Sequence, residues 1–348
     1  MSIKKIGILT GGGDCPGLNA AIRAVVRKGI KSHNYEIFGI KNGWAGLING
    51  DISPLTMDSI SGILHKGGTI LGTSRTNPYK KENGIVNIKK TIKEFGLDVI
   101  VAIGGEDTIG AAAKLFIEGI NVVGIPKTID NDLFGTEYTF GFDTAVSIIT
   151  EAIDRLHTTA ESHHRIMVLE VMGRHAGWLA TYGGIAGGAD LILIPEEPFD
   201  IEKVCQHLKN RHNAGKHFSV VVVSEGAKEI NIGKLSTTAK KKDDFGHERL
   251  GGIGDILSKE IEKSTGFETR VTVLGHTQRG GTPTAFDRIL ATRFGLAAVD
   301  LINQNKFGFM VGLQSNKIVP VPLKEVLGKL KTVPPEIYDL TKVFFEYD

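Results

Sequence analysis

Short apolar runs alternate along this chain with segments of helical periodicity. The runs are rich in Val and Ile and show little polar alternation, a pattern typical of buried parallel strands. Strands are predicted at residues 5–9, 36–40, 99–103, 122–125, 166–171, 191–194, 219–223 and 271–274. The alternation predicts an α/β fold of two doubly wound lobes with mainly parallel sheets and a cleft between them.

Apolar residues recur at helical spacing between the predicted strands. Two helices would bury the sets Leu18, Ile22, Val25, Val26 and Val146, Ile149, Ile153, Leu156. We expect Asp143 to cap the N-terminus of the second helix, because an Asp side chain accepts hydrogen bonds from free backbone N–H groups. Residues 228–252 are polar and interrupt the alternation. A solvated surface loop without function is the favoured interpretation of that segment.

Composition narrows the classes of protein that the pattern allows. The chain has 348 residues, of which 41% are hydrophobic and 23% charged, as in a globular protein of two ordinary domains. A net charge of +2 without a Lys/Arg-rich arm argues against a nucleic-acid partner. Cys15 and Cys205 lie outside any CxxC, so neither a disulfide framework nor a zinc knuckle is expected. With no signal-peptide region and no apolar run near the ~20 residues of a membrane span, we expect a cytoplasmic protein without a membrane partner.

The most informative segment follows the predicted strand at 122–125 and contains Lys127, Asp130 and Asp132. Open α/β sheets bind their ligands at the carboxyl ends of the strands. One carboxylate there can act as a general base toward a hydroxyl, while the other holds a metal or tunes the first. Lys127 supplies a point charge for phosphate. An isolated acid cluster could be a turn, but other predicted strands also end in polar residues.

Glycine-rich turns follow two other predicted strands. Residues 10–17 read TGGGDCPG and include Gly11 and Gly12, whose backbone N–H groups can approach an anion at the start of a helix. Residues 104–108 read GGEDT and precede a helix predicted at 110–115; adjacent acids beside phosphate suit Mg²⁺. For the first turn, an equally supported alternative to phosphate binding is a tight turn that needs glycine for steric reasons. For the second turn, the alternative is that the two acids complement the helix dipole. Neither the dinucleotide fingerprint G-x-G-x-x-G nor G-x-x-x-x-G-K-[ST] occurs.

Arginine, histidine and glutamate follow further strand ends. Residues 67–75, which lie between the two glycine-rich turns, combine glycines with Arg75, which can stabilise charge on a transferring phosphoryl group. Residues 172–177, 224–226 and 275–281 read MGRHAG, SEG and GHTQRGG. Such a set suits a phosphorylated polyol, because Arg binds phosphate bidentately and Glu and His bind hydroxyls. Each residue alone is more often structural, but their shared position at strand ends favours one site.

These blocks resemble the phosphofructokinase family over essentially the whole chain. The matching stretches are GGGDCPGLNAAIR, GGTILGTSR, GGEDT, PKTIDND, GFDTA, SHHRIMVLEVMGRHAGWLA, SEG and ETRVTVLGHTQRGGTPTAFDR. The resemblance implies two Rossmann-like lobes. Residues 1–141 and 278–328 would form the larger lobe, which binds the phosphoryl donor, and residues 142–277 and 329–348 the smaller lobe, which binds a sugar phosphate.

The resemblance also implies phosphoryl transfer to the C1 hydroxyl of fructose 6-phosphate. Asp130 would be the general base, supported by Asp132 near a Mg²⁺ ion, and Glu106 would take the place of the family's usual magnesium-binding Asp. Donor contacts would come from Gly11, Gly12, Gly105, Asp107, Thr108, Lys127 and Arg75, with Arg75 steadying the transition state. Sugar-phosphate contacts would come from Thr128, Met172, Gly173, Arg174, Glu225, His276 and Arg279. Arg165 and Arg270 match arginines that reach the sugar phosphate from a neighbouring subunit, which implies a homodimer or homotetramer.

Two positions indicate the phosphoryl donor. ATP-using members of the family typically have glycine where this chain has Asp107, and many bacterial ones have glycine in place of Lys127. An Asp side chain fills the room of the α-phosphate and nucleoside and repels a further phosphate. Lys127 alone would be weak evidence, so Asp107 carries the prediction. We expect a reversible enzyme that uses pyrophosphate in glycolysis and gluconeogenesis; the alternative is an ATP-dependent 6-phosphofructokinase.

Two further classes of function are less well supported. A non-catalytic sugar-phosphate sensor would not need Asp130, and a nicotinamide oxidoreductase would need the missing dinucleotide fingerprint.

Regulation by effectors is expected to be weak. Arg23 and Arg27 match the family's effector site, but two of its other basic positions are His157 and Ala214 here. Activity on sedoheptulose 7-phosphate stays open.

Overall fold

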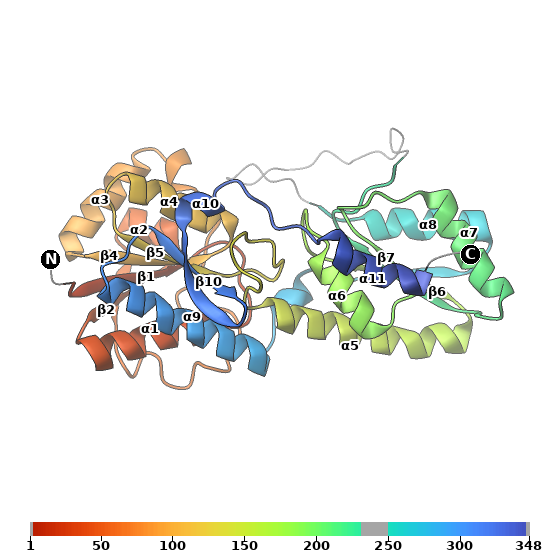
Figure 1. The fold of residues 1–348 in the computed structure, drawn as a ribbon, viewed down its shortest axis with the longest axis horizontal. Helices are drawn as coiled ribbons and strands as arrows, with labels where there is room; N and C mark the ends of the chain where they lie inside the picture. The colour runs from red at the N-terminus through yellow and green to blue at the C-terminus, as the bar shows by residue number, and fades with distance from the viewer. Residues whose placement is uncertain (1–2, 231–249, 346–348) are drawn as a thin grey trace.

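The computed structural model describes residues 3–230 and 250–345 (Figure 1). The strands are β1 (Lys5–Thr10), β2 (Glu36–Ile40), β3 (Ile52–Leu55), β4 (Val99–Gly104), β5 (Val122–Pro126), β6 (Ile166–Val171), β7 (Leu191–Leu193), β8 (Ser219–Ser224), β9 (Thr269–Val273), β10 (Phe309–Gln314) and β11 (Lys317–Pro322). The helices are α1 (Leu18–His33), α2 (Trp44–Asn49), α3 (Gly84–Phe95), α4 (Glu106–Ile117), α5 (Phe142–His163), α6 (Trp178–Gly187), α7 (Ile201–Asn213), α8 (Ile253–Thr265), α9 (Ala285–Asn303), α10 (Leu323–Val326) and α11 (Pro335–Phe345). Two short 3-10 helices are η1 (Pro78–Lys80) and η2 (Gly275–Arg279).

The larger sheet has seven strands in the order β11-β10-β5-β4-β1-β2-β3. Its inner strands run parallel, and β3 and β11 pair antiparallel at the two edges. Alternate residues of β4 enter different cores, with Val99 and Val101 in one and Ile100 and Ala102 in the other. Both faces of the sheet are therefore covered, which explains the unbroken apolar runs of the sequence.

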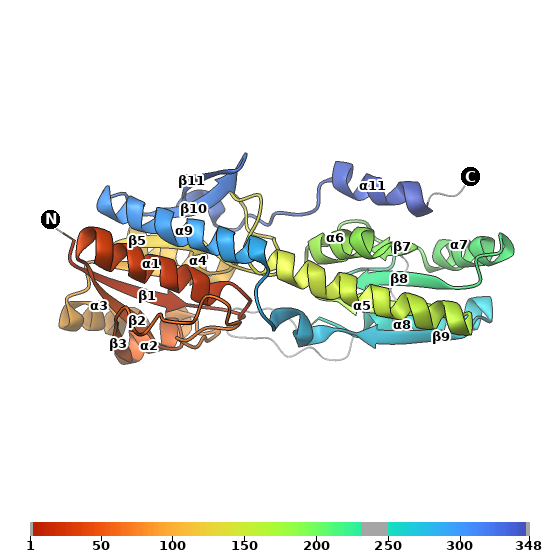
Figure 2. The same cartoon turned by 90° about the horizontal axis from the view of Figure 1, so that it is seen from below.

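Helices cover the larger sheet on both faces (Figure 2). α1 and α9 pack against each other on one face, while α2, α3 and α4 belong to the core of the other face. The predicted apolar set of α1, namely Leu18, Ile22, Val25 and Val26, is buried. This arrangement confirms the prediction of a doubly wound α/β fold.

The smaller sheet has four parallel strands in the order β7-β8-β6-β9. α5 packs with α6, and α7 packs with α8. The chain enters this lobe through α5, returns through η2 and α9, and crosses again to reach α11 (Figure 1). The predicted lobe boundaries fall at the start of α5, inside η2 and just after α10, and they stay a prediction.

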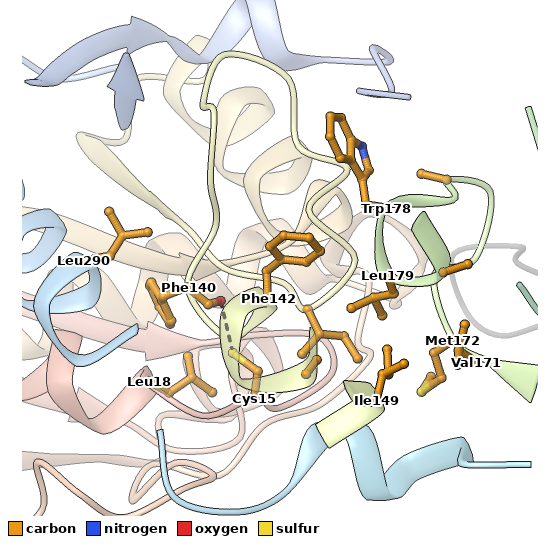
Figure 3. Packing of buried hydrophobic residues seen from close by; sticks show 14 of the residues in the cluster. Cys15, Leu18, Phe140, Phe142, Ile149, Val171, Met172, Trp178, Leu179 and Leu290 are labelled. Atoms are coloured by element: carbon orange, nitrogen blue, oxygen red, sulfur yellow. Dashed lines mark hydrogen bonds between the residues drawn. The ribbon is translucent and has the colours of Figure 1, made fainter. Parts of the chain in front are cut away.

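A single apolar core continues across the junction of the two lobes (Figure 3). Cys15 and Leu18 from the larger lobe belong to the same cluster as Phe142 at the start of α5 and Leu179 of α6. The Cys15 thiol donates to Phe140 O over 3.6 Å, and burial raises its pKa. The lobes are therefore joined by packing as well as by covalent connections.

Every strand predicted from the sequence is present, with ends shifted by at most two residues. β3, β10 and β11 were not predicted. β3 and β11 contain Pro54 and Pro320, which are tolerated because both strands lie at an edge of the sheet. No helix in the two described ranges has the length and apolar character needed to cross a bilayer.

The prediction that Asp143 caps α5 is wrong. The N-cap is Gly141 at φ 96°, without a side-chain hydrogen bond to the helix. Asp143 lies in the first turn, and its Oδ2 accepts a hydrogen bond from Thr284 Oγ1 over 2.6 Å. The helix predicted at 110–115 also begins four residues earlier, at Glu106. Of the polar segment 228–252, residues 231–249 lie outside the described part of the chain.

Candidate active site

One pocket gathers residues from the carboxyl ends of strands in both sheets. Its walls come from the turns after β1, β4 and β5, with contributions from the turn after β6 and from η2. The lining residues are Gly12, Gly13, Arg75, Gly105, Glu106, Asp107, Thr108, Lys127, Thr128, Asp130, Asp132, Arg174 and Arg279. The structure therefore brings together most of the site residues predicted from the sequence, and their chemical roles stay predictions.

Asp130 is held by its own turn. Thr128 Oγ1 donates to Asp130 Oδ2 over 3.0 Å and accepts from the Asp130 N–H over 3.1 Å. Arg279 Nη2 lies 3.8 Å from the same carboxylate oxygen. Within the described residues, the buried Asp130 Oδ1 has no hydrogen-bond partner. One carboxylate oxygen is therefore fixed, and the other remains for a ligand.

Asp132 belongs to a cluster of acids. Burial raises the pKa of Asp132, and the carboxylates of Asp130 and Glu106 add to the rise, against the opposing effect of Arg174. A cation would relieve this repulsion. Among the described residues no group of three or more His, Cys, Asp and Glu side chains makes a complete metal site. The oxygen donors present fit Mg²⁺, which is commonly held by one or two carboxylates together with substrate phosphate oxygens.

Lys127 joins the acid turn (residues 127–132) to the glycine-rich turn after β1. Its buried ammonium donates to Gly13 O, and burial lowers its pKa. Gly12 has φ 79°, and a Cβ there would lie 3.6 Å from Lys127 Nζ. A Cβ at Gly11 would lie only 2.5 Å from Thr108 Oγ1. The steric interpretation therefore holds for Gly11, which does not line the pocket, whereas Gly12 does.

Glu106 and Asp107 form the first turn of α4, whose N-cap is Gly105. Their charges complement the helix dipole, so the structural alternative also applies to them. Asp107 lines a second, adjoining pocket as well as the first. The other residues of this second pocket are Asn77, Tyr79, Glu106, Gly110, Ala111, Lys114, Val326, Leu327 and Gly328. Glu106 and Asp107 therefore both stand where the two pockets meet.

The loop after β6 (residues 172–177), the sugar-side loop, approaches the pocket from the smaller lobe. Gly173 at φ 135° and Arg174 at φ 55° turn the backbone sharply. The Arg174 N–H donates to Glu225 Oε1 over 3.1 Å, and the Met172 N–H donates to Gln278 Oε1 over 3.3 Å. Burial raises the pKa of Glu225 to about 7, and the Asp130 charge is the next cause. Met172, Gly173 and Glu225 thus lie next to the pocket, although only Arg174 lines it.

Arg279 reaches across the junction to the glycine-rich turn. Its Nη1 donates to Asp14 O over 3.4 Å, and only 8% of its surface is exposed. A Cβ at Gly13 would lie 2.7 Å from the same Nη1. Glycine at position 13 therefore leaves the room that the guanidinium occupies.

Three further predicted sugar-phosphate residues, Arg165, Arg270 and His276, also do not line this pocket. Arg165 precedes β6 and Arg270 is the second residue of β9, so both lie at the amino ends of the strands. The six residues of β6 span roughly 20 Å, which separates Arg165 from the pocket at the other end. Arg165 Nε lies 2.8 Å from Glu268 Oε2, and Arg270 also pairs with Glu268. His276 in η2 is exposed.

Two residues at or beside the site were not predicted from the sequence. Gly13 belongs to the glycine-rich block but was not assigned a role. Lys331 Nζ donates to Asn131 Oδ1 over 3.0 Å, between the two acids of the turn. No local signal marks Lys331, because 200 residues separate it from Asn131.

Comparison with known proteins shows the family to which this chain belongs. The family described as Phosphofructokinase matches residues 5–302. The pyrophosphate–fructose 6-phosphate 1-phosphotransferase of Amycolatopsis methanolica is 58% identical over 341 residues, which cover 98% of this chain and 99% of the relative. The ATP-dependent 6-phosphofructokinase 2 of Clostridium perfringens is 51% identical over 348 residues, covering 96% of this chain and 94% of the relative.

A solved structure has the same fold. The pyrophosphate-dependent phosphofructokinase of Nitrosospira multiformis superposes with a TM-score of 0.84, covering 98% of this chain and 91% of its own, at 23% identity. The two α/β lobes of this chain are thus shared in fold with a solved phosphofructokinase. This chain belongs to the phosphofructokinase family, as its motifs predicted.

Proposed function

We propose that this protein transfers a phosphoryl group from Mg-pyrophosphate to the C1 hydroxyl of fructose 6-phosphate, giving fructose 1,6-bisphosphate and phosphate. The position of Asp107, where the two pockets meet, carries the choice of donor. A nucleotide with its terminal phosphate beside Lys127 would have to extend past the Asp107 carboxylate toward the second pocket. Pyrophosphate ends before that point, so it avoids the repulsion.

Asp130 is the proposed general base. It accepts the C1 hydroxyl proton while the hydroxyl oxygen bonds to the terminal phosphorus of pyrophosphate, and the bond from that phosphorus to the leaving phosphate breaks. Arg75 and Lys127 line the same pocket and offset the charge that spreads over the phosphoryl oxygens. The protein's contribution is then positioning and electrostatic stabilisation. Because phosphoryl transfer from pyrophosphate is closer to thermoneutral than transfer from ATP, we expect a reversible enzyme that serves glycolysis and gluconeogenesis.

Glu106 and Asp132 are the proposed Mg²⁺ residues. The raised pKa of Asp132 and the unpaired Asp130 Oδ1 support a cation at this place. When bound, Mg²⁺ neutralises charge on the donor phosphates and helps to align them.

The sugar phosphate would lie against Thr128, Arg174, Glu225 and Arg279. Arg165 and Arg270, at the other ends of their strands, would serve the site of a neighbouring subunit, since they are too far from the pocket of their own chain. This supports a homodimer or homotetramer. We also place the protein in the cytoplasm, because Cys15 and Cys205 are both free thiols.

An ATP-dependent reaction is the second candidate, because a pocket that could receive a nucleoside adjoins the first. Calorimetric titration with pyrophosphate and with ATP, each with Mg²⁺, separates the two. We expect pyrophosphate to bind at least about 100-fold more tightly, a difference of roughly 2.7 kcal/mol. Equal or tighter binding of ATP would favour the second candidate.

A further inference from the structure

Residues 327–334, the C-terminal strap, connect α10 of the larger lobe to α11 beside the smaller sheet (Figure 2). The strap passes the acid turn and then the start of α6. Leu330 forms an isolated β-bridge with Leu133, and the Lys331 N–H donates to Asp132 O over 2.8 Å. The strap is therefore bonded to the backbone of a residue that lines the candidate active site.

The Lys331 side chain holds the loop that follows the acid turn. Its Nζ donates to Asn131 Oδ1 over 3.0 Å, to Thr136 O over 2.9 Å and to Glu137 O over 2.8 Å. An ammonium group has three N–H donors, so all of them are used. The ammonium group therefore links Asn131 of the acid turn to Thr136 and Glu137 at the far end of that loop.

Asn131 is the residue between the two acids of the turn. It has φ 51°, a left-handed conformation that few non-glycine residues adopt. Its Oδ1 also accepts from the Thr139 N–H over 3.0 Å. These side-chain hydrogen bonds keep the turn in a conformation that the backbone alone would not favour, and Lys331 supplies one of them.

Lys331 also contacts the smaller lobe. Its carbonyl accepts a hydrogen bond from Trp178 Nε1 over 2.8 Å, and its Nζ lies 5.1 Å from the centre of the same indole ring. Trp178 begins α6 immediately after the sugar-side loop, and Figure 3 shows it at the lobe junction with Met172. Glu196 extends the connection, because its Oε1 accepts from both the Val333 and the Gly177 N–H over 2.9 Å.

We propose that Lys331 is a positioning residue for phosphoryl transfer. It keeps the acid turn in the conformation that aims Asp130 and Asp132 into the pocket, and it fixes that turn relative to the sugar-side loop. This inference rests on the proposed function. Lys331 does not line the pocket, so its loss should lower kcat far more than it weakens binding of the sugar phosphate.

The test compares Lys331→Met, Lys331→Gln and Lys331→Arg with a matched control, Lys342→Met. Lys342 lies on α11 and makes surface ion pairs with Glu197 and Asp339. Turnover is measured with pyrophosphate and with ATP, and the dissociation constant of fructose 6-phosphate is measured separately by equilibrium binding. We expect Lys331→Met to lower kcat by about 10- to 100-fold, the effect of displacing a reacting group by about 1 Å.

The dissociation constant of the sugar phosphate and the other three variants give further readouts. The sugar-phosphate dissociation constant should stay within about threefold of wild type, because a residue that acts only in the transition state changes kcat alone. Lys331→Arg should keep the most activity and Lys331→Gln an intermediate level, since both retain N–H donors for the loop carbonyls. Lys342→Met should match wild type.

Wild-type kcat in Lys331→Met would overturn the proposal, and so would a rise in the dissociation constant as large as the fall in kcat. An equal loss in Lys342→Met would show that the effect is not specific to Lys331. If Lys331→Met does not fold, Lys331→Gln is judged by the same criteria. Each variant is compared with wild type using the donor that the wild type turns over. A wrong assignment of the phosphoryl donor therefore does not affect this test. A wild type inactive with both donors would overturn the proposed function and this inference with it.

Discussion

Arg279 Nη2 lies 3.8 Å from Asp130 Oδ2, and both side chains are buried. Asp130 follows β5 of the larger sheet, whereas Arg279 follows β9 of the smaller one. The proposed base and an arm proposed to bind the sugar phosphate are therefore in contact across the junction of the lobes.

Asp130→Asn should remove the proton acceptor and leave the shape of the turn unchanged. Loss of a general base costs about 10²- to 10⁴-fold in kcat. The dissociation constant of fructose 6-phosphate, measured by equilibrium binding, should change little because Arg174, Glu225 and Arg279 remain. Turnover close to wild type would show that another group accepts the proton.

Asp107 should set the preference between donors. Asp107→Gly removes both the charge and the side chain where the two pockets meet, so we expect ATP turnover to rise and pyrophosphate turnover to fall. Asp107→Asn is the matched control, since it removes the charge but keeps the size. Rescue of ATP use by Gly alone would assign the effect to sterics, and rescue by both variants would assign it to charge. No change in either variant would exclude Asp107 as the determinant.

Glu170 should anchor the N-terminus of α8. Its buried carboxylate accepts hydrogen bonds from the Gly252 N–H over 3.0 Å and from the Gly254 N–H over 2.8 Å. Glu170→Gln places an amide N–H against one of these donors, so we expect urea denaturation to show a loss of about 1–3 kcal/mol in the free energy of unfolding. Glu262→Gln, on the exposed face of the same helix, should stay within about 0.5 kcal/mol of wild type. Equal stability of the two variants would contradict the anchor.

His207 should make stability fall in acid. Its ring is buried in α7 beside Asp190 O, and burial lowers its pKa from 6.5 to about 4. Between these two values the unfolded chain binds a proton that the folded chain does not, so the free energy of unfolding rises with pH. The slope from this group is at most ~1.4 kcal/mol per pH unit. His207→Gln should have a flatter pH dependence between pH 4 and 6.5, and superimposable slopes would contradict this assignment.

Residues at strand ends could be predicted from the sequence. Parallel strands bring their carboxyl ends to one edge, so Lys127 and Asp130 after β5 had to lie near Gly12 after β1. The approach of the second lobe with Arg174 followed from family resemblance, since no local rule orients one lobe against another.

Features that depend on distant partners could not be predicted. Asp143 satisfies the local rule for an N-cap, but it bonds to Thr284, which is 141 residues away in the sequence. Lys331 carries no local signal at all, and only the folded strap places its ammonium beside Asn131. β11 has two prolines in six residues, and its position at the edge of the sheet, which permits them, is a property of the tertiary fold.

The choice of donor is tested most directly by the turnover of the wild-type protein. Formation of fructose 1,6-bisphosphate from fructose 6-phosphate is followed with Mg²⁺ and either pyrophosphate or ATP at matched concentrations. We expect pyrophosphate to support turnover at least about 100-fold better in kcat/KM, a difference in transition-state stabilisation of roughly 2.7 kcal/mol. Equal or better turnover with ATP would contradict the role of Asp107 and leave an ATP-dependent phosphofructokinase as the function.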